Sequence, residues 1–257
     1  MTQELRFVGD PPLYLTSALL SNAGLSHLFT TRYFPGVTPP AEPTSPFGPD
    51  AVKLLAERGL ARAPVAFLRQ VHGARAARVE RGGLAGRGDV LATEKPGLPL
   101  AVFTADCLSI IVYDPIRRAL AVAHAGWRGT IQGVARAAAQ ALIAVGGAPE
   151  DFVVGIGPSI GPCCYEVDRP VIEPLSAAFP ERWAAWARPA GPGRWRLDLW
   201  EANEDQLRAA GLRPERIDNP RLCTACRTDL FFSYRRGRGQ GRLVAVAALP
   251  DGPAPTC

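Results

Sequence analysis

Short apolar runs separated by polar turns dominate the middle of the chain. Residues 108–113 and 119–123 are almost entirely apolar, and the segment 114–118 between them begins with an Asp-Pro pair. Proline after aspartate is typical of the start of a β-turn. The pattern therefore predicts a β-hairpin with two apolar strands.

Other segments predict a mixture of helices and strands. Residues 129–145 are rich in alanine, lack proline and end at two glycines, which predicts the longest helix. A strand is expected at 65–71, a Gly/Arg-rich turn at 81–88, and a second hairpin from 230–234 and 242–249. Further helices are expected at 51–59, 170–179, 181–187 and 200–210.

This mixture predicts one α+β domain over residues 1–257, with sheets covered by helices. No linker divides the chain, and the core is expected at about 27–249. Six prolines between residues 35 and 50 predict a loop, and the tail 250–257 is expected to fray.

Hydrophobic content, net charge and the lack of a long apolar run indicate which class of protein this is. With 47% hydrophobic residues in 257, the chain can build a sizeable core. The net charge of +5 favours anionic ligands such as phosphate but does not require nucleic acid. The first residues lack a secretory pattern, and no apolar run reaches the ~18–20 residues of a membrane span. We therefore expect a cytoplasmic protein, without membrane association and monomeric, whose six cysteines are reduced.

The open end of the first hairpin brings two reactive side chains together. If Tyr113 faces Ala119, then Cys107 and His124 fall nearly opposite each other, with Cβ atoms about 4.5–5.5 Å apart. His72, at the end of the strand 65–71, is a third candidate. Two imidazoles and one thiolate form a good zinc set, and three ligands leave one position open, as in catalytic zinc sites.

Two other readings of these residues stay open. Cys107 could instead be a nucleophile with His124 or His72 as its base, and then it would not be a metal ligand. Asp106, next to Cys107, could accept a proton or orient a ligand, or it could simply stabilise a turn.

Four further cysteines form a separate pattern. Cys223 and Cys226 make a CxxC pair, and with Cys163 and Cys164 they could form a Cys₄ structural zinc site. Adjacent cysteines are poor partners for one tetrahedral ion, so we favour burial of these residues as small apolar side chains. Cys257 is given no role.

Five blocks in the chain resemble the YfiH family, the laccase-domain or multicopper polyphenol oxidoreductase-like group. The resemblance runs from about residue 27 to residue 249. The blocks are Gln70-Val-His-Gly73, Thr104-Ala-Asp-Cys107, His124-Ala-Gly-Trp-Arg-Gly-Thr130, Gly157-Pro-Ser-Ile-Gly-Pro-Cys-Cys-Tyr-Glu-Val167 and Phe231-Phe-Ser-Tyr-Arg-Arg236.

The resemblance implies a four-layer α/β/β/α sandwich with mixed sheets, similar in shape to a deamidating bacterial toxin domain. It also implies a zinc-dependent enzyme that cleaves adenosine, inosine, guanosine and methylthioadenosine with phosphate and deaminates adenosine. The family's zinc ligands correspond to His72, Cys107 and His124. The family's older label implies a copper-dependent polyphenol oxidase, but the chain has only three histidines and no second histidine cluster for such a centre.

Phosphorolysis requires an anion site, for which arginine is well suited. Arg32, Arg128 and Arg235 are the candidates, and Asp106 or Glu166 could carry the proton in deamination. The chain departs from the family pattern within residues 33–58, where Thr31-Arg32 is followed by Tyr33-Phe-Pro-Gly36 rather than the usual glycine pair.

The sequence therefore predicts a zinc-dependent purine nucleoside phosphorylase with adenosine deaminase activity, whose partners are purine nucleosides and phosphate. A copper-dependent polyphenol oxidase and a cysteine hydrolase or amidase using Cys107 are the alternatives.

Overall fold

The computed structural model describes residues 6–37, 45–237 and 241–251. Residues 38–44 of the predicted proline-rich loop, the tail residues 252–257 with Cys257, and the turn residues 238–240 lie outside the described residues.

Two mixed sheets form the centre of the molecule. The seven-stranded sheet has the order β1 (Arg6–Val8), β2 (Tyr14–Thr16), β3 (Ser26–Thr30), β16 (Leu243–Ala248), β8 (Leu100–Thr104), β4 (Ala66–Arg69) and β6 (Gly83–Arg87). The six-stranded sheet has the order β15 (Ile217–Asp218), β11 (Val153–Ile156), β9 (Leu108–Asp114), β10 (Ala119–Ala125), β7 (Val90–Thr93) and β5 (Ala76–Arg78).

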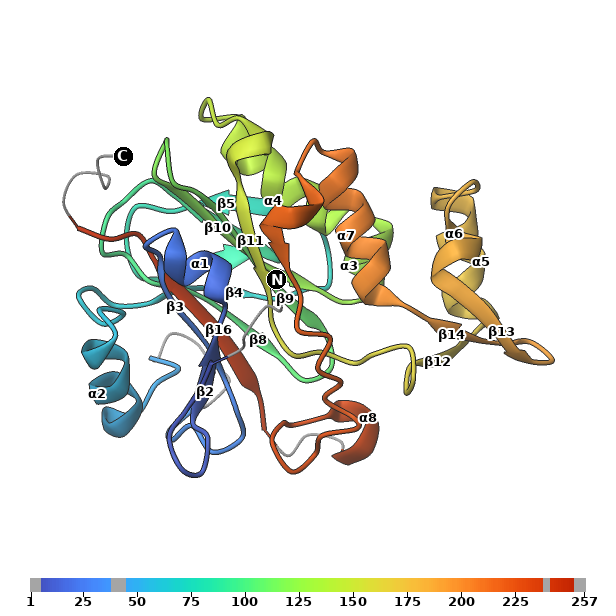
Figure 1. Ribbon diagram of the computed structural model, residues 1–257, viewed down its shortest axis with the longest axis horizontal. Helices are drawn as coiled ribbons and strands as arrows, with labels where there is room; N and C mark the ends of the chain where they lie inside the picture. Colours follow the sequence, from blue (N-terminus) through green and yellow to red (C-terminus); the bar gives the residue numbers. More distant parts are fainter. Residues whose placement is uncertain (1–5, 38–44, 238–240, 252–257) are drawn as a thin grey trace.

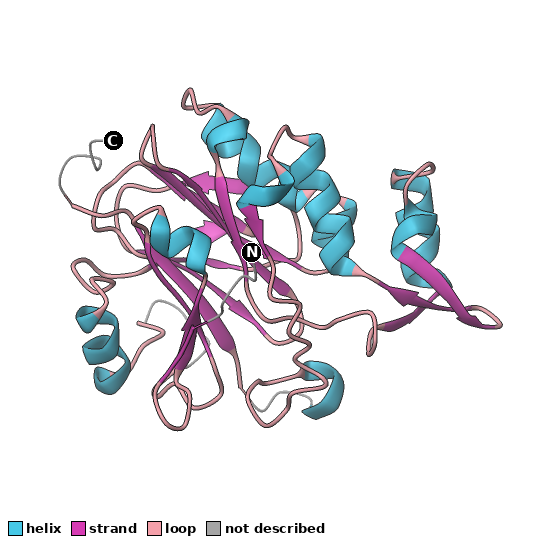
Figure 2. Cartoon of the chain, viewed as in Figure 1, coloured by secondary structure: helices cyan, strands magenta, loops and turns pink. Residues whose placement is uncertain are grey.

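Helices cover the two outer faces (Figures 1 and 2). The helix α2 (Pro49–Glu57) lies on the seven-stranded sheet, and α3 (Trp127–Ile131), α4 (Val134–Ile143) and α7 (Leu199–Ala209) lie on the six-stranded sheet. This arrangement confirms the predicted α+β fold with four α/β/β/α layers. The remaining helices are α1 (Ala18–Asn22), α5 (Arg169–Ala178), α6 (Trp183–Trp186), α8 (Tyr234–Gly237) and the 3₁₀ turns Pro149–Asp151 and Pro214–Arg216.

A small third sheet projects from one side of the molecule, together with α5 and α6 (Figure 1). Its strands are β12 (Glu166–Asp168), β14 (Arg194–Leu197) and β13 (Ala187–Gly191). Among the described residues, no helix is long and apolar enough to cross a membrane.

The hairpin β9–β10 has two buried faces because nearly every position is apolar. Ile110 and its neighbours on the same face pack with α4, whereas Ile111 and Val122 pack between the two sheets against Val102 of β8. Both strands are therefore fully buried, and the predicted hairpin is confirmed.

Several predicted elements were wrong. Residues 129–145 do not form one helix, because Gly133 adopts a left-handed conformation (φ 80°) between α3 and α4. Residues 81–88 are not only a turn, because β6 pairs in parallel with β4. Residues 181–187 form only the short α6, which leads directly into β13.

The second predicted hairpin is also wrong. The strand β16 is buried on both faces and pairs with β3 and β8, strands that are distant in sequence. Residues 230–233 form no strand and α8 begins at Tyr234, where the amide of Arg235 donates to the carboxylate of Asp106 at 2.7 Å.

Candidate active site

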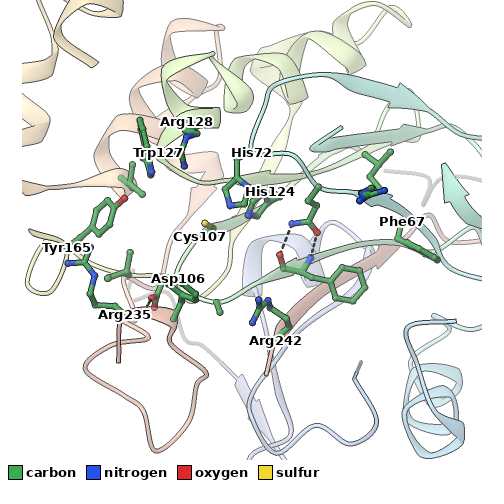
Figure 3. A pocket seen from close by; sticks show the side chains of 18 of the residues that line it. Phe67, His72, Asp106, Cys107, His124, Trp127, Arg128, Tyr165, Arg235 and Arg242 are labelled. Atoms are coloured by element: carbon green, nitrogen blue, oxygen red, sulfur yellow. Dashed lines mark hydrogen bonds between the residues drawn. The ribbon is translucent and has the colours of Figure 1, made fainter. Parts of the chain in front are cut away.

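Three side chains from separate parts of the chain converge at one edge of the two sheets. His72 follows β4, Cys107 lies between β8 and β9, and His124 lies in β10; their ligand atoms all lie within 4.8 Å of one another. The two imidazole rings meet edge to face, with centroids 4.8 Å apart (Figure 3). The structure therefore brings together the three residues that the sequence proposed as a metal set.

The strand register differs from the predicted one by one residue. Asp114, not Tyr113, pairs with Ala119, so His124 lies opposite Ser109 rather than opposite Cys107. Cys107 precedes β9, in the link that carries the chain from one large sheet to the other. Its sulfur still reaches the imidazoles, because the link turns at Asp106 with a positive φ of 85°.

A buried carboxylate that the sequence analysis missed organises the site. Asp89 accepts hydrogen bonds from the backbone amides of His72 (2.9 Å) and Gly73 (2.7 Å), and from Nδ1 of His124 (2.8 Å). It therefore holds the loop of His72, whose φ is 60°, and fixes the ring of His124. Its position directly before a fully buried strand was the available signal, because an acidic residue there needs several donors.

Charges within the site favour a thiolate beside a cationic imidazole. Burial alone would raise the pKa of Cys107, but His124 and His72 lower it to about 6. Burial alone would lower the pKa of His124, but Cys107 and Asp89 raise it to about 9. For Asp89, burial opposes ionisation, and the hydrogen bonds from His124 and Gly73 nevertheless lower its pKa.

The donor set fits a zinc ion. Because Nδ1 of His124 is bound to Asp89, its Nε2 is the nitrogen left for a metal, an arrangement common among zinc-binding histidines. His72 and Cys107 complete three ligands, one fewer than a tetrahedral zinc ion takes, and all three residues line the cavity. The third histidine of the chain, His27, is not available, since its ring nitrogens bond to the Ser17 amide and the Leu25 carbonyl.

A cavity of about 950 Å³ opens beside these three side chains. Its wall combines apolar and aromatic side chains with arginines, and Arg128 lies beside Trp127 as Arg235 lies beside Tyr165 (Figure 3). The aromatic and apolar lining includes Phe67, Phe103, Trp127, Tyr165 and Tyr234. The cavity is large enough for a ligand of nucleoside size.

Two of the three predicted substrate arginines line this cavity. Arg128 lies over Trp127, 4.2 Å from its ring centroid, and Arg235 lies over Tyr165 at 5.2 Å. Arg32 does not line the cavity; its guanidinium donates to the Thr228 carbonyl and lies over Phe232.

The two predicted acids differ in position. Asp106 lines the cavity, and its carboxylate accepts from the Thr224 hydroxyl (2.6 Å) and the Arg235 amide (2.7 Å). Glu166 lies outside the cavity lining, 3.7 Å from Arg196.

Other lining residues were not identified from the sequence. Gln70 exchanges two hydrogen bonds of 2.8 Å with the backbone of Phe103, shown as dashed lines in Figure 3. It thereby ties the loop before His72 to β8. Arg242 also lines the cavity, whereas the sequence predicted it only as the first residue of a hairpin strand.

Comparison with known proteins gives matches over most of the chain. A purine nucleoside phosphorylase of Deinococcus radiodurans is 32% identical over 240 residues, covering 89% of this chain and 91% of that protein. Purine nucleoside phosphorylase YlmD of Geobacillus stearothermophilus is 43% identical over 161 residues, covering 61% of this chain and 58% of that protein. The human protein named purine nucleoside phosphorylase LACC1 is 38% identical over 169 residues, which is 38% of its length. The chain thus matches less than two thirds of the last two proteins.

Two solved structures share the whole fold. The crystal structure of YlmD from Geobacillus stearothermophilus has a TM-score of 0.82 and 32% identity, covering 96% of this chain and 100% of that chain. The structure of Bacillus licheniformis YfiH has a TM-score of 0.81 and 30% identity, covering 95% of this chain and 98% of that chain. The sequence profile of the family described as multi-copper polyphenol oxidoreductase laccase matches residues 50–250. The resemblance to the YfiH group is thereby confirmed, and the chain belongs to the multi-copper polyphenol oxidoreductase laccase family.

Proposed function

We propose that this protein is a zinc-dependent purine nucleoside phosphorylase that also deaminates adenosine. The observation that carries the proposal is the meeting of His72, Cys107 and His124 in a cavity that several arginines, Arg128 and Arg235 among them, also line. The names of the relatives from Deinococcus and Geobacillus support the same activity.

In the proposed phosphorolysis, a phosphate oxygen forms a bond to C1′ of the ribose while the bond from C1′ to the purine nitrogen breaks. Ribose 1-phosphate and the free base result, and the departing ring nitrogen takes up a proton. Arg128 and Arg235 are suited to hold the phosphate, because guanidinium groups bind oxyanions with two parallel hydrogen bonds. Trp127 and Tyr165, which lie against these two arginines, add aromatic surface to the same part of the cavity for contact with the purine.

His72, Cys107 and His124 would hold the zinc ion, with Asp89 orienting His124. When bound there, zinc would supply a Lewis acid and lower the pKa of a water molecule to about 7. In deamination, water adds to C6 of adenine and ammonia leaves, a step that requires proton transfer. Asp106 is our candidate for that transfer, because it lines the cavity directly beside Cys107.

The proposed substrates are adenosine, inosine, guanosine and methylthioadenosine, and a direct assay tests them. Zinc content is measured in the purified protein, and base release is followed with each nucleoside, with and without phosphate. We expect hypoxanthine release from inosine that depends on phosphate and disappears in Cys107→Ser. Zinc-loaded protein that releases no base in the presence of phosphate would refute the proposal.

A cysteine hydrolase is the second candidate, and the lowered pKa of Cys107 favours it. A thiolate paired with an imidazolium is the arrangement of a nucleophilic cysteine. The two candidate functions differ in the state of the Cys107 sulfur, which binds zinc in the phosphorylase and is a free nucleophile in the hydrolase. Iodoacetamide should modify Cys107 in zinc-depleted protein and leave it intact when zinc is bound, whereas a cysteine hydrolase would be inactivated in both conditions.

A copper-dependent polyphenol oxidase has less support. Among the described residues, His72, Cys107 and His124 form the histidine-containing metal group, and His27 is engaged elsewhere. Oxygen uptake with a phenol and a copper absorption band would be needed to revive this alternative.

A further inference from the structure

Four cysteines form a second group of possible metal ligands, outside the residues assigned to the active site. Cys163 and Cys164 belong to the loop between β11 and β12, and Cys223 and Cys226 belong to the segment between β15 and α8. All four are free cysteines, and their sulfur atoms lie within 4.8 Å of one another. The sulfur of Cys226 lies 3.5 Å from that of Cys163 and 3.4 Å from that of Cys164.

Burial does not explain this cluster. Cys223 is buried, but Cys163 and Cys226 are exposed, so our prediction that these residues serve as small apolar core side chains is wrong for these two. Four thiols gathered from segments about 60 residues apart, with two of them at the surface, indicate a function for the sulfur atoms themselves.

The spacing of the sulfur atoms suits one tetrahedral ion. Zinc binds thiolate sulfur at about 2.3 Å, which places the four sulfurs of a Cys₄ site about 3.8 Å apart. The two measured contacts of 3.4 and 3.5 Å, and the limit of 4.8 Å for the whole set, bracket that spacing.

Tight backbone turns allow the adjacent residues Cys163 and Cys164 to serve as ligands of one ion. The amides of Cys164 and Tyr165 both donate to the Gly161 carbonyl at 3.0 Å, so Cys163 and Cys164 lie in a tight turn. In the CxxC segment, the amides of Cys226 and Arg227 donate to the Cys223 carbonyl at 3.2 and 3.0 Å. Each turn therefore directs its pair of sulfurs toward the other pair.

The two turns are fastened to each other by main-chain hydrogen bonds. The amide of Ser159 donates to the Leu222 carbonyl, and the amide of Thr224 donates to the Ser159 carbonyl, each at 3.1 Å. Thus the cluster is assembled by the fold itself, before any ion is considered.

Hydrogen-bond donors near two of the four sulfurs, those of Cys223 and Cys164, favour their negatively charged form. The amide of Gly161 lies 3.3 Å from the Cys223 sulfur, and the guanidinium of Arg236 lies 3.8 Å from the Cys164 sulfur. Arg196 donates to the Cys163 carbonyl at 2.7 Å and adds a second positive charge. Four thiolates with one Zn²⁺ carry a net charge of −2, which these two arginines oppose.

We propose that Cys163, Cys164, Cys223 and Cys226 bind one zinc ion in a structural Cys₄ site, separate from the site of His72, Cys107 and His124. Four protein ligands leave no open position, as in structural rather than catalytic zinc sites. The ion joins the loop that carries Tyr165 to the segment that leads to Arg235, and both of these residues line the cavity. The proposal does not depend on the proposed function.

Zinc content of the full-length protein and three variants tests the site. The proteins are purified without chelator, and zinc per chain is measured by mass spectrometry. We expect Cys226→Ser to hold one zinc ion per chain fewer than the parent; with zinc also in the proposed active site, the counts are two in the parent, one in Cys226→Ser, one in the matched control Cys107→Ser and none in the double variant. Because Cys226 is exposed, its replacement removes a ligand without opening a cavity in the core.

Cobalt substitution provides a second readout that does not depend on retention of zinc. In Cys107→Ser, cobalt should give an intense thiolate-to-metal absorption band that vanishes when Cys226→Ser is added. Equal zinc content in the parent and in Cys226→Ser, iron in place of zinc at this site, or no cobalt band in Cys107→Ser would each overturn the proposal.

Discussion

The carboxylate of Asp89 accepts a hydrogen bond from Nδ1 of His124 at 2.8 Å while it also holds the backbone amides of the His72 loop. One buried side chain thus positions two of the three proposed zinc ligands.

Replacing this carboxylate should weaken metal binding. We expect Asp89→Asn to lower zinc affinity about 10–100-fold, because the amide no longer holds His124 as a charged acceptor. Chelator competition measures the affinity. The matched control is Asp218→Asn, another buried aspartate, whose carboxylate binds Ser17. Equal zinc affinity in Asp89→Asn and the control would contradict the orienting role.

Gly126 leaves space for the ligands in its neighbourhood. A Cβ atom at this position would lie 2.9 Å from the Cys107 sulfur and 3.1 Å from Cδ2 of His72, while its φ of −87° suits any residue. We therefore expect Gly126→Ala to lower zinc affinity by about tenfold or more through ligand displacement. Gly48→Ala is the control, because its Cβ would meet nothing closer than 3.7 Å. Unchanged affinity in Gly126→Ala would show that the site tolerates displacement.

Phosphate binding should depend on Arg128 more than on Arg32. Loss of a hydrogen bond to a charged group costs about 1.5–3 kcal/mol, which corresponds to roughly a 10–100-fold rise in KM for phosphate. We expect that rise in Arg128→Ala and a smaller one in Arg32→Ala, because Arg32 lies outside the cavity lining. Steady-state kinetics at varied phosphate concentration measures KM for phosphate in both variants. A larger effect for Arg32 would restore the role that the sequence suggested for it.

Stability should decrease in mild acid because of His27. Burial, the largest cause, lowers its pKa from 6.5 to about 4. The unfolded chain therefore binds more protons than the folded one between these values. The contribution of neutral His27 to the free energy of unfolding is fully present above about pH 6.5. It is lost as the pH falls toward 4, by up to roughly 3 kcal/mol.

Urea unfolding at several pH values measures this loss. In His27→Gln, which has no titrating ring, the slope of stability against pH between 4 and 6.5 should flatten. An unchanged slope in that variant would assign the acid sensitivity to other groups.

Local patterns predicted the parts of the fold that local sequence controls. The uninterrupted apolar run of β9 and β10 identified the central hairpin, but its register was one residue off because Asp114 belongs to the strand. The position of β16 between β3 and β8 could not be read from residues 230–249, since pairing with distant strands leaves no mark in the local pattern.

The candidate active site was also predicted only in part from the sequence. His72, Cys107 and His124 stood out because imidazoles and a thiolate are rare and chemically specific. Asp89 was missed because its importance comes from the four donors that surround it, and those donors come from distant backbone and from His124. The cysteine cluster was underestimated because the turns at Gly161 and Cys223 are not visible in the spacing alone.

The proposed metal ligands come from both large sheets. His72 follows a strand of the seven-stranded sheet, His124 lies in the six-stranded sheet, and Cys107 sits in the link between them. An ion held by all three would resist sliding of one sheet against the other. Backbone amide exchange in β4 and β10 should consequently slow together when the metal binds. Metal binding at the edge would thereby reduce local opening in both sheets.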